Sequence, residues 1–128
     1  MNTYQLSFGT LAVLDEHTAE VIVDEGEELD LAAVDEYHAF LATHLKPPIC
    51  LLINKLNGYT YTFEAQLKIG DINGLCAMAI LTYNRASRVS TQNMAALPRQ
   101  TQWNMEIFEE RETALAWLAG QAKTAKRR

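Results

Sequence analysis

LLINKLNGYTYTFEAQ, residues 51–66, decides what kind of sheet this chain builds. An apolar run ends at Asn54, and the dipeptide Asn57-Gly58 precedes a segment in which aromatic side chains alternate with threonine. Asn-Gly is a strong signal for a β-hairpin, and alternation with a period of two is typical of a strand. In contrast, residues 63–69 are rich in helix formers. The stretch therefore predicts either a hairpin or the entry into a helix.

The flanking segments favour the helix. Residues 49–53 and 75–81 are both short, apolar on both faces and bounded by turn signals, as is typical of central strands covered on both sides. Parallel strands need a connection of a dozen or more residues, usually a helix. We therefore expect a loop through Tyr61 and a helix over about 62–72, with Thr60 or Thr62 as its N-cap.

Patterns on either side extend this reading to most of the chain. Alternation predicts a first strand over 4–8 and a hairpin formed by 11–14 and 19–23. Asp30 is a suitable N-cap for a helix that Pro47-Pro48 ends. The apolar face of that helix consists of Leu31, Val34, His38, Leu41 and Leu45. Towards the C-terminus we expect a helix over about 87–97, a strand over 103–107 and a helix over 109–122.

This order predicts one α/β domain over residues 1–122. We expect an open mixed β-sheet with an N-terminal hairpin, central parallel strands and about four helices. Residues 123–128 are basic and predict a frayed tail. The side chains expected in the core are Leu41, Leu52, Ile80, Leu115 and Leu118.

Composition limits the class of protein. The 128 residues are 48% hydrophobic and 21% charged, which is ordinary for a globular domain. No apolar run is long enough for a transmembrane segment, and the N-terminus lacks the features of a signal peptide, so we expect a cytoplasmic protein. Cys50 and Cys76 lie within apolar runs and are expected to be buried free thiols.

Charge is distributed unevenly along the chain. Residues 1–45 carry ten acidic side chains and no lysine or arginine, whereas most of the remaining charge is basic. The net charge of −5 makes nucleic acid a poor partner. The asymmetry fits an acidic helix beside a basic one within the chain, a charged protein partner, or a homodimer that sets the acidic stretch 24–36 against basic residues of 85–99.

Motifs for catalysis, metals or cofactors do not stand out. His17, His38 and His44 have no ligand-pair spacing, neither cysteine has a nearby histidine, and no phosphate-binding or dinucleotide glycine loop occurs. The acidic cluster over 24–30 is typical of a solvated rim or a patch for a partner rather than of a catalytic pair. We therefore expect no catalytic residue, no metal and no cofactor.

Three segments carry a resemblance to a known family. Leu51-Leu52-Ile53-Asn54 leads into a helix, Ala77-Met78-Ala79-Ile80-Leu81 forms the next strand, and Phe108 precedes a helix that contains Ala114-Leu115-Ala116-Trp117-Leu118. Over residues 10–120 this pattern resembles the STAS domain of bacterial anti-sigma-factor antagonists, and more closely the small stand-alone SpoIIAA-like bacterial proteins of unknown function. The resemblance implies a non-enzymatic regulatory or protein-interaction module with an unidentified protein partner.

In the antagonists, a serine in an Asp-Ser-x-Gly motif after the third strand is phosphorylated. The corresponding stretch here, residues 58–63, contains neither that serine nor the aspartate, so the resemblance leaves Thr60 and Thr62 as candidate phosphoacceptors or as helix caps.

Two further candidate sites support an alternative function, the binding of a small anionic or lipid-like ligand. Arg85, Ser87 and Arg88 follow a central strand at a predicted helix N-terminus, where free N–H groups and the helix dipole favour anions; the other reading is a capped helix start with solvated arginines. Tyr59, Tyr61 and Phe63 are candidates to line an apolar pocket, although aromatic residues in such positions also serve as core.

Overall fold

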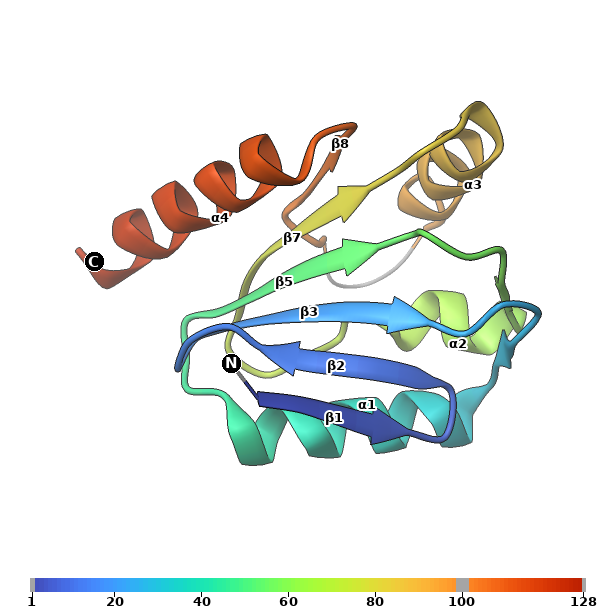
Figure 1. Ribbon diagram of the computed structural model, residues 1–128, viewed down its shortest axis with the longest axis horizontal. Coiled ribbons are helices and arrows are strands. Elements are labelled where there is room, and N and C mark those ends of the chain that lie inside the picture. The colour runs from blue at the N-terminus through green and yellow to red at the C-terminus, as the bar shows by residue number, and fades with distance from the viewer. Residues whose placement is uncertain (1, 99–101, 128) are drawn as a thin grey trace.

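The computed structural model describes residues 2–98 and 102–127 and contains one mixed six-stranded sheet (Figure 1). Its strands are β1 (Asn2–Leu6), β2 (Gly9–Val13), β3 (Thr18–Val23), β5 (Ile49–Asn54), β7 (Leu75–Leu81) and β8 (Met105–Phe108), adjacent in that order. The first three strands pair antiparallel, and β3, β5, β7 and β8 run parallel. The expected N-terminal hairpin and the α/β class with parallel central strands are therefore confirmed.

The connection from β5 to β7 settles the question posed by residues 51–66. It contains the helix α2 (Phe63–Lys68), and β5 and β7 pair in parallel with Ile53 opposite Ile80. The helical interpretation is thus correct, although α2 ends earlier than expected. The same connection also contains the short strand β6 (Thr60–Tyr61), which pairs with β4 (Glu28–Leu29) in a separate two-stranded sheet. Strands of two residues leave no periodic pattern that a sequence could reveal.

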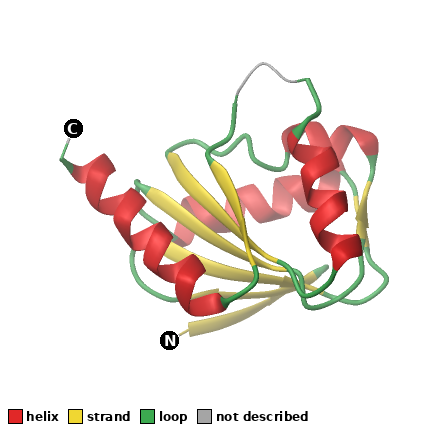
Figure 2. Ribbon diagram, turned by 90° about the horizontal axis from the view of Figure 1, so that it is seen from above, coloured by secondary structure: helices red, strands yellow, loops and turns green. Residues whose placement is uncertain are grey.

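Helices cover both faces of the large sheet. Helix α1 (Leu31–His44) and α2 lie on one face, and α4 (Arg111–Lys126) lies on the other (Figures 1 and 2). The N-cap of α1 is Asp30, as expected, because its Oδ1 accepts a hydrogen bond of 3.0 Å from the Ala33 amide. Helix α3 (Arg85–Ala95) follows the carboxyl end of β7.

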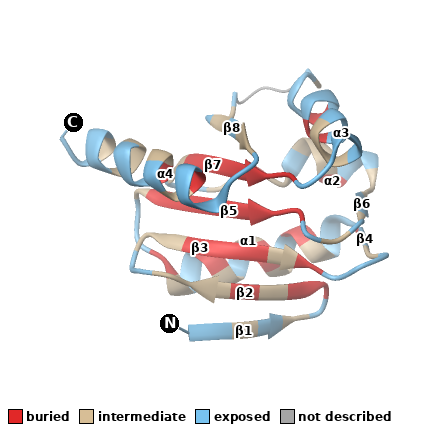
Figure 3. Ribbon diagram, turned by 45° about the horizontal axis from the view of Figure 1, so that its top comes forward, coloured by how far each residue is buried: buried red, intermediate tan, exposed pale blue. Residues whose placement is uncertain are grey.

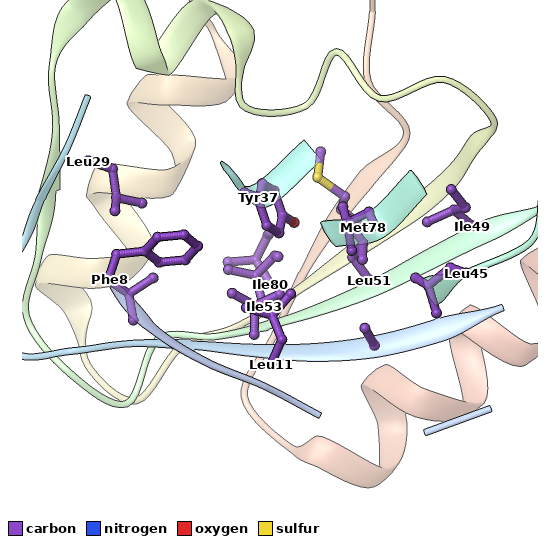
Figure 4. Close-up of a cluster of buried hydrophobic side chains, with 14 residues drawn as sticks. Phe8, Leu11, Leu29, Tyr37, Leu45, Ile49, Leu51, Ile53, Met78 and Ile80 are labelled. Carbon is purple, nitrogen blue, oxygen red and sulfur yellow. The ribbon is translucent and has the colours of Figure 1, made fainter. Parts of the chain in front are cut away.

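Within the described part of the chain, two apolar clusters form the core, one on each face of the sheet. The larger joins β2, β3, β5 and β7 to α1, and its labelled side chains converge in Figure 4. The smaller packs α4 against β5 and β7. Four of the five expected core residues are at most 2% exposed, namely Leu41, Leu52, Ile80 and Leu118. Leu115 is only half-buried, because Leu118 lies at the centre of the buried face of the helix and Leu115 lies towards its edge.

The start of α3, the end of α4 and the buried face of α1 differ from the expectation. Helix α3 begins at Arg85 because Asn84 caps it by accepting a hydrogen bond of 2.8 Å from the Ser87 amide. Helix α4 continues to Lys126, so residues 123–126 are helical and do not form a frayed tail. In α1, Leu31 is exposed and Tyr37 is buried in its place, because the buried face rotates towards Phe8 and Leu11 of the hairpin. Arg99, one of the basic residues of 85–99, lies outside the described residues.

Candidate functional site

The end of the sheet where the parallel strands terminate holds a cleft of about 470 Å³. One wall is the loop over 55–59 that follows β5, and the opposite wall is the start of α3 from Asn84 to Ser90. Glu25, from the connection after β3, completes the rim. Clefts at the carboxyl ends of parallel strands are the usual ligand sites of α/β sheets, so this cleft is the first candidate for a functional site.

Lys55 is the unusual residue of the cleft. Lys55 comes directly after the last residue of β5, and it is only 7% exposed. The ammonium nitrogen lies 4.8 Å from the ring centroid of Tyr59 and 5.4 Å from that of Tyr61. No carboxylate or other hydrogen-bond acceptor among residues 2–98 and 102–127 pairs with this ammonium. Burial lowers the pKa of Lys55 to about 8, so the side chain is still mainly cationic at pH 7.

The tyrosines beside Lys55 belong to the edge of the larger core cluster. Their hydroxyl oxygens lie 3.3 Å apart, and burial raises the pKa of both Tyr59 and Tyr61. The cavity that they share with Tyr37 measures about 20 Å³, which is room for about one water molecule and not for an alkyl chain. Phe63, the third residue of the expected apolar pocket, is 61% exposed and does not line this cavity.

A second polar cluster lies on the opposite face of the sheet, at the start of α4. Glu20, on β3, is buried and accepts hydrogen bonds from Arg111 at 2.7 Å and from Asn54 at 2.9 Å. The Asn54 carbonyl oxygen in turn accepts a hydrogen bond of 2.8 Å from the Tyr83 hydroxyl. All the buried polar groups of this cluster therefore have partners, as a structural network requires.

The three residues of the expected anion site all lie in the first turn of α3, but their side chains have different environments. Ser87 lines the cleft, but its hydroxyl donates to the Asn84 carbonyl at 3.2 Å. Arg88 forms an ion pair with Glu109 at 3.0 Å, and Arg85 is exposed. Neither arginine lines the cleft. The cation that does line it is Lys55, which is not among the predicted site residues.

A signal for Lys55 is present in the sequence. Leu51, Ile53 and Lys55 alternate, so a strand over 49–54 directs the lysine towards the same face as two core residues. A charged residue in register with the apolar face of a central strand indicates one of two things. Either the strand leaves the core at that residue, or the charge itself is buried. Here the chain stays buried for one more residue, because the 55–59 loop folds back over the lysine.

Comparison with known proteins supports the fold alone. No protein-family model matches the sequence, and no curated protein matches it. Among solved structures, the chain is similar to an uncharacterized DUF3478-family protein from Shewanella loihica PV-4, described as having a SpoIIAA-like fold. The two share 15% sequence identity with a TM-score of 0.50, over 91% of this chain and 90% of the other. The chain has a SpoIIAA-like fold. The STAS resemblance is thereby confirmed at the level of architecture.

Within the SpoIIAA-like fold, the loop that the resemblance singled out leads directly into α2. Thr62 is the N-cap of α2, and its hydroxyl accepts a hydrogen bond of 3.2 Å from the Ala65 amide. Thr60 lies in β6 with an exposed side chain. A role as phosphoacceptor stays a prediction for both residues.

The remaining candidate ligands have structural partners. His17 and His38 each contact a backbone carbonyl oxygen, and His44 stacks on Phe40. Cys50 is a buried free thiol, whereas Cys76 is free and only half-buried. In the part of the chain that the structure describes, no three histidine, cysteine or acidic side chains gather as metal ligands. Over the same residues, every helix is too short or too polar to cross a bilayer.

Proposed function

We propose that the chain is a non-enzymatic STAS-like interaction module that binds a protein partner through the loops at the carboxyl ends of its parallel strands. The observation that supports this is the placement of exposed apolar side chains. Among the described residues, the large hydrophobic side chains that are exposed are Leu31, Leu56, Phe63, Tyr83 and Val89.

These side chains come from five separate segments at one end of the molecule. Leu31 and Phe63 begin α1 and α2, Leu56 and Tyr83 follow β5 and β7, and Val89 lies in the first half of α3. Figure 3 shows exposed residues at the ends of these elements beyond the buried strands. Scattered exposed apolar residues are normal, and the gathering of five of them at one end of the molecule supports an interaction surface there.

Charge at the same end indicates the chemistry of the partner. The connection from β3 to α1 exposes the carboxylates of Asp24, Glu25, Glu28 and Asp30. Complementary charge accelerates encounter and excludes wrong partners. We therefore expect a protein whose docking surface combines apolar side chains with a flank of lysine or arginine.

The test is the affinity of the purified chain for a partner identified by affinity capture. A Leu56→Ser/Phe63→Ser double variant should bind at least ten times more weakly, because each lost apolar contact removes about 25 cal/mol per Å² of buried area. The matched control, Ala42→Ser/Ala119→Ser, changes exposed positions away from these loops and should bind normally. A captured partner that binds the double variant as tightly as the unmodified chain would show that this surface is not used.

A further inference from the structure

We propose that the cleft binds a small phosphoryl or related oxyanion, with Lys55 as its charged contact and the first amide groups of α3 as hydrogen-bond donors. This inference goes beyond the partner surface, since it concerns the interior of the cleft and a residue that is not exposed.

Lys55 is the first reason. An ammonium group has three donors, and burying it without acceptors is costly. The faces of Tyr59 and Tyr61 offset part of that cost, but they leave the N–H donors of the ammonium without an oxygen acceptor. An oxyanion in the adjoining cleft would supply both the missing charge and the missing acceptors.

The start of α3 is the second, independent reason. Asn84 satisfies the amides of Ser87 and Arg88, with hydrogen bonds of 2.8 Å and 3.3 Å. The amides of Arg85 and Ala86 donate to no acceptor within the described ranges, and Ala86 lines the cleft. Free amides at the positive end of an eleven-residue helix are suited to bind an anion.

Among the residues that the structure describes, Glu25 is the one carboxylate that lines the cleft, and it opposes an anion there. Because its side chain is exposed, solvent and salt screen its repulsion, whereas the charge of the buried Lys55 is screened much less. The volume of about 470 Å³ exceeds the needs of a phosphate ion and falls within the range of small-molecule sites. A small phosphorylated metabolite would fill it better than free phosphate.

The proposal can be tested by NMR titration of the full chain at constant ionic strength, with inorganic phosphate and, separately, glucose 6-phosphate. We expect saturable shifts of the Ala86 amide and of the Lys55 side chain. Lys55→Met should weaken binding at least tenfold, and Glu25→Gln should strengthen it several-fold. The matched control, Lys68→Met, removes an exposed lysine that does not line the cleft and should leave binding unchanged. Tighter binding of the ester than of phosphate would identify a phosphorylated metabolite as the ligand, and equal binding would identify free phosphate.

The unmodified chain provides a second measurement that needs no variant. An oxyanion bound beside Lys55 stabilises the ammonium form, so the midpoint of the Lys55 ¹³Cε titration should rise above its value of about 8 when either ligand is added. An unchanged midpoint at tens of millimolar of both ligands, or shifts that never saturate and persist in Lys55→Met, would overturn the proposal. Neither result depends on a protein partner.

Discussion

Arg111 Nη2 lies 2.7 Å from Glu20 Oε1, an ion pair that ties the first residue of α4 to the middle of β3. Helix α4 packs on β5 and β7. The ion pair therefore connects the helix to β3, the neighbouring strand of β5, on which the helix itself does not pack. Asn54 continues the connection, since it donates to Glu20 and accepts from Tyr83. One hydrogen-bonded network therefore joins the middle of β3, the end of β5, the segment after β7 and the start of α4.

Removing only the arginine of this ion pair should lower the free energy of unfolding more than removing both charged partners. In Arg111→Met, the Glu20 carboxylate stays buried with only Asn54 as partner, and we expect a loss of about 1–3 kcal/mol in the free energy of unfolding. Arg127→Met, at an exposed position, should change it by less than about 0.5 kcal/mol. Chemical denaturation provides the measurement. The double variant Glu20→Gln/Arg111→Met should recover part of the loss, and no recovery would contradict a charge-based coupling.

The same carboxylate should make stability depend on pH. Burial raises the pKa of Glu20, but hydrogen bonds from Arg111 and Asn54 and the charge of Arg111 outweigh it, so the pKa lies below the ordinary value of 4.5. A lowered pKa in the folded state contributes stability above the unfolded value, and this contribution disappears as the pH falls through the folded value. The difference in unfolding free energy between the unmodified chain and Glu20→Gln should therefore shrink below about pH 4.5. A difference that stays constant from pH 7 to 3 would contradict this.

Two glycines should respond in opposite ways to substitution by alanine. A Cβ at Gly70 would lie 2.5 Å from the Trp103 ring, which is held by a hydrogen bond of 3.0 Å from its Nε1 to Asp71. We expect Gly70→Ala to cost about 1–3 kcal/mol and to change the fluorescence of Trp103. Gly120, within α4, has open space around it, so Gly120→Ala should stabilise the chain by about 0.5–1 kcal/mol. Equal effects at both positions would show that Trp103 does not pack on Gly70.

The position of α4 can be tested through two leucines on neighbouring faces. Leu118 is 2% exposed and packs on the second core cluster, so Leu118→Ala should cost about 2–5 kcal/mol through loss of apolar contact and formation of a cavity. Leu115 is half-buried, and Leu115→Ala should cost less. Denaturation of the two variants side by side is sufficient, and a loss below about 1 kcal/mol for Leu118→Ala would place the helix elsewhere.

The sequence predicted those elements whose pattern depends on the large sheet. Strands β5 and β7 are covered on both faces and are continuous apolar runs, and this alone implied a helical connection between them. The sequence does not predict the end of α4, because the basic residues after Ala122 have good helix propensity but no apolar partner. Hydrophobic periodicity marks only those helical residues that pack on such a partner.

The candidate site was harder to predict than the fold. Its central feature, the burial of Lys55, results from the loop over 55–59 and from Tyr61, which contact the lysine only after the chain has folded back. The sequence favoured Arg85 and Arg88 over Lys55 as anion-binding residues, because a helix N-terminus can be recognised from neighbouring residues alone. Pairing of Arg88 with Glu109, 21 residues away, is not local.

Self-association stays a prediction, and the structure adds a location to it. The exposed carboxylates of 24–30 and the exposed Arg85 occupy the same end of the molecule, so a two-fold axis at that end could set the acidic patch of one copy against the arginine of the other. We expect a dimer at tens of micromolar in low salt that weakens in 1 M salt, where the screening length is about 3 Å. Arg85→Glu should weaken it, whereas Arg127→Glu, at the far end of α4, should not. Analytical sedimentation is the measurement. A monomer in low salt would exclude the dimer. A dimer that responds neither to salt nor to Arg85→Glu would instead be held together by apolar contacts such as Leu56 and Phe63.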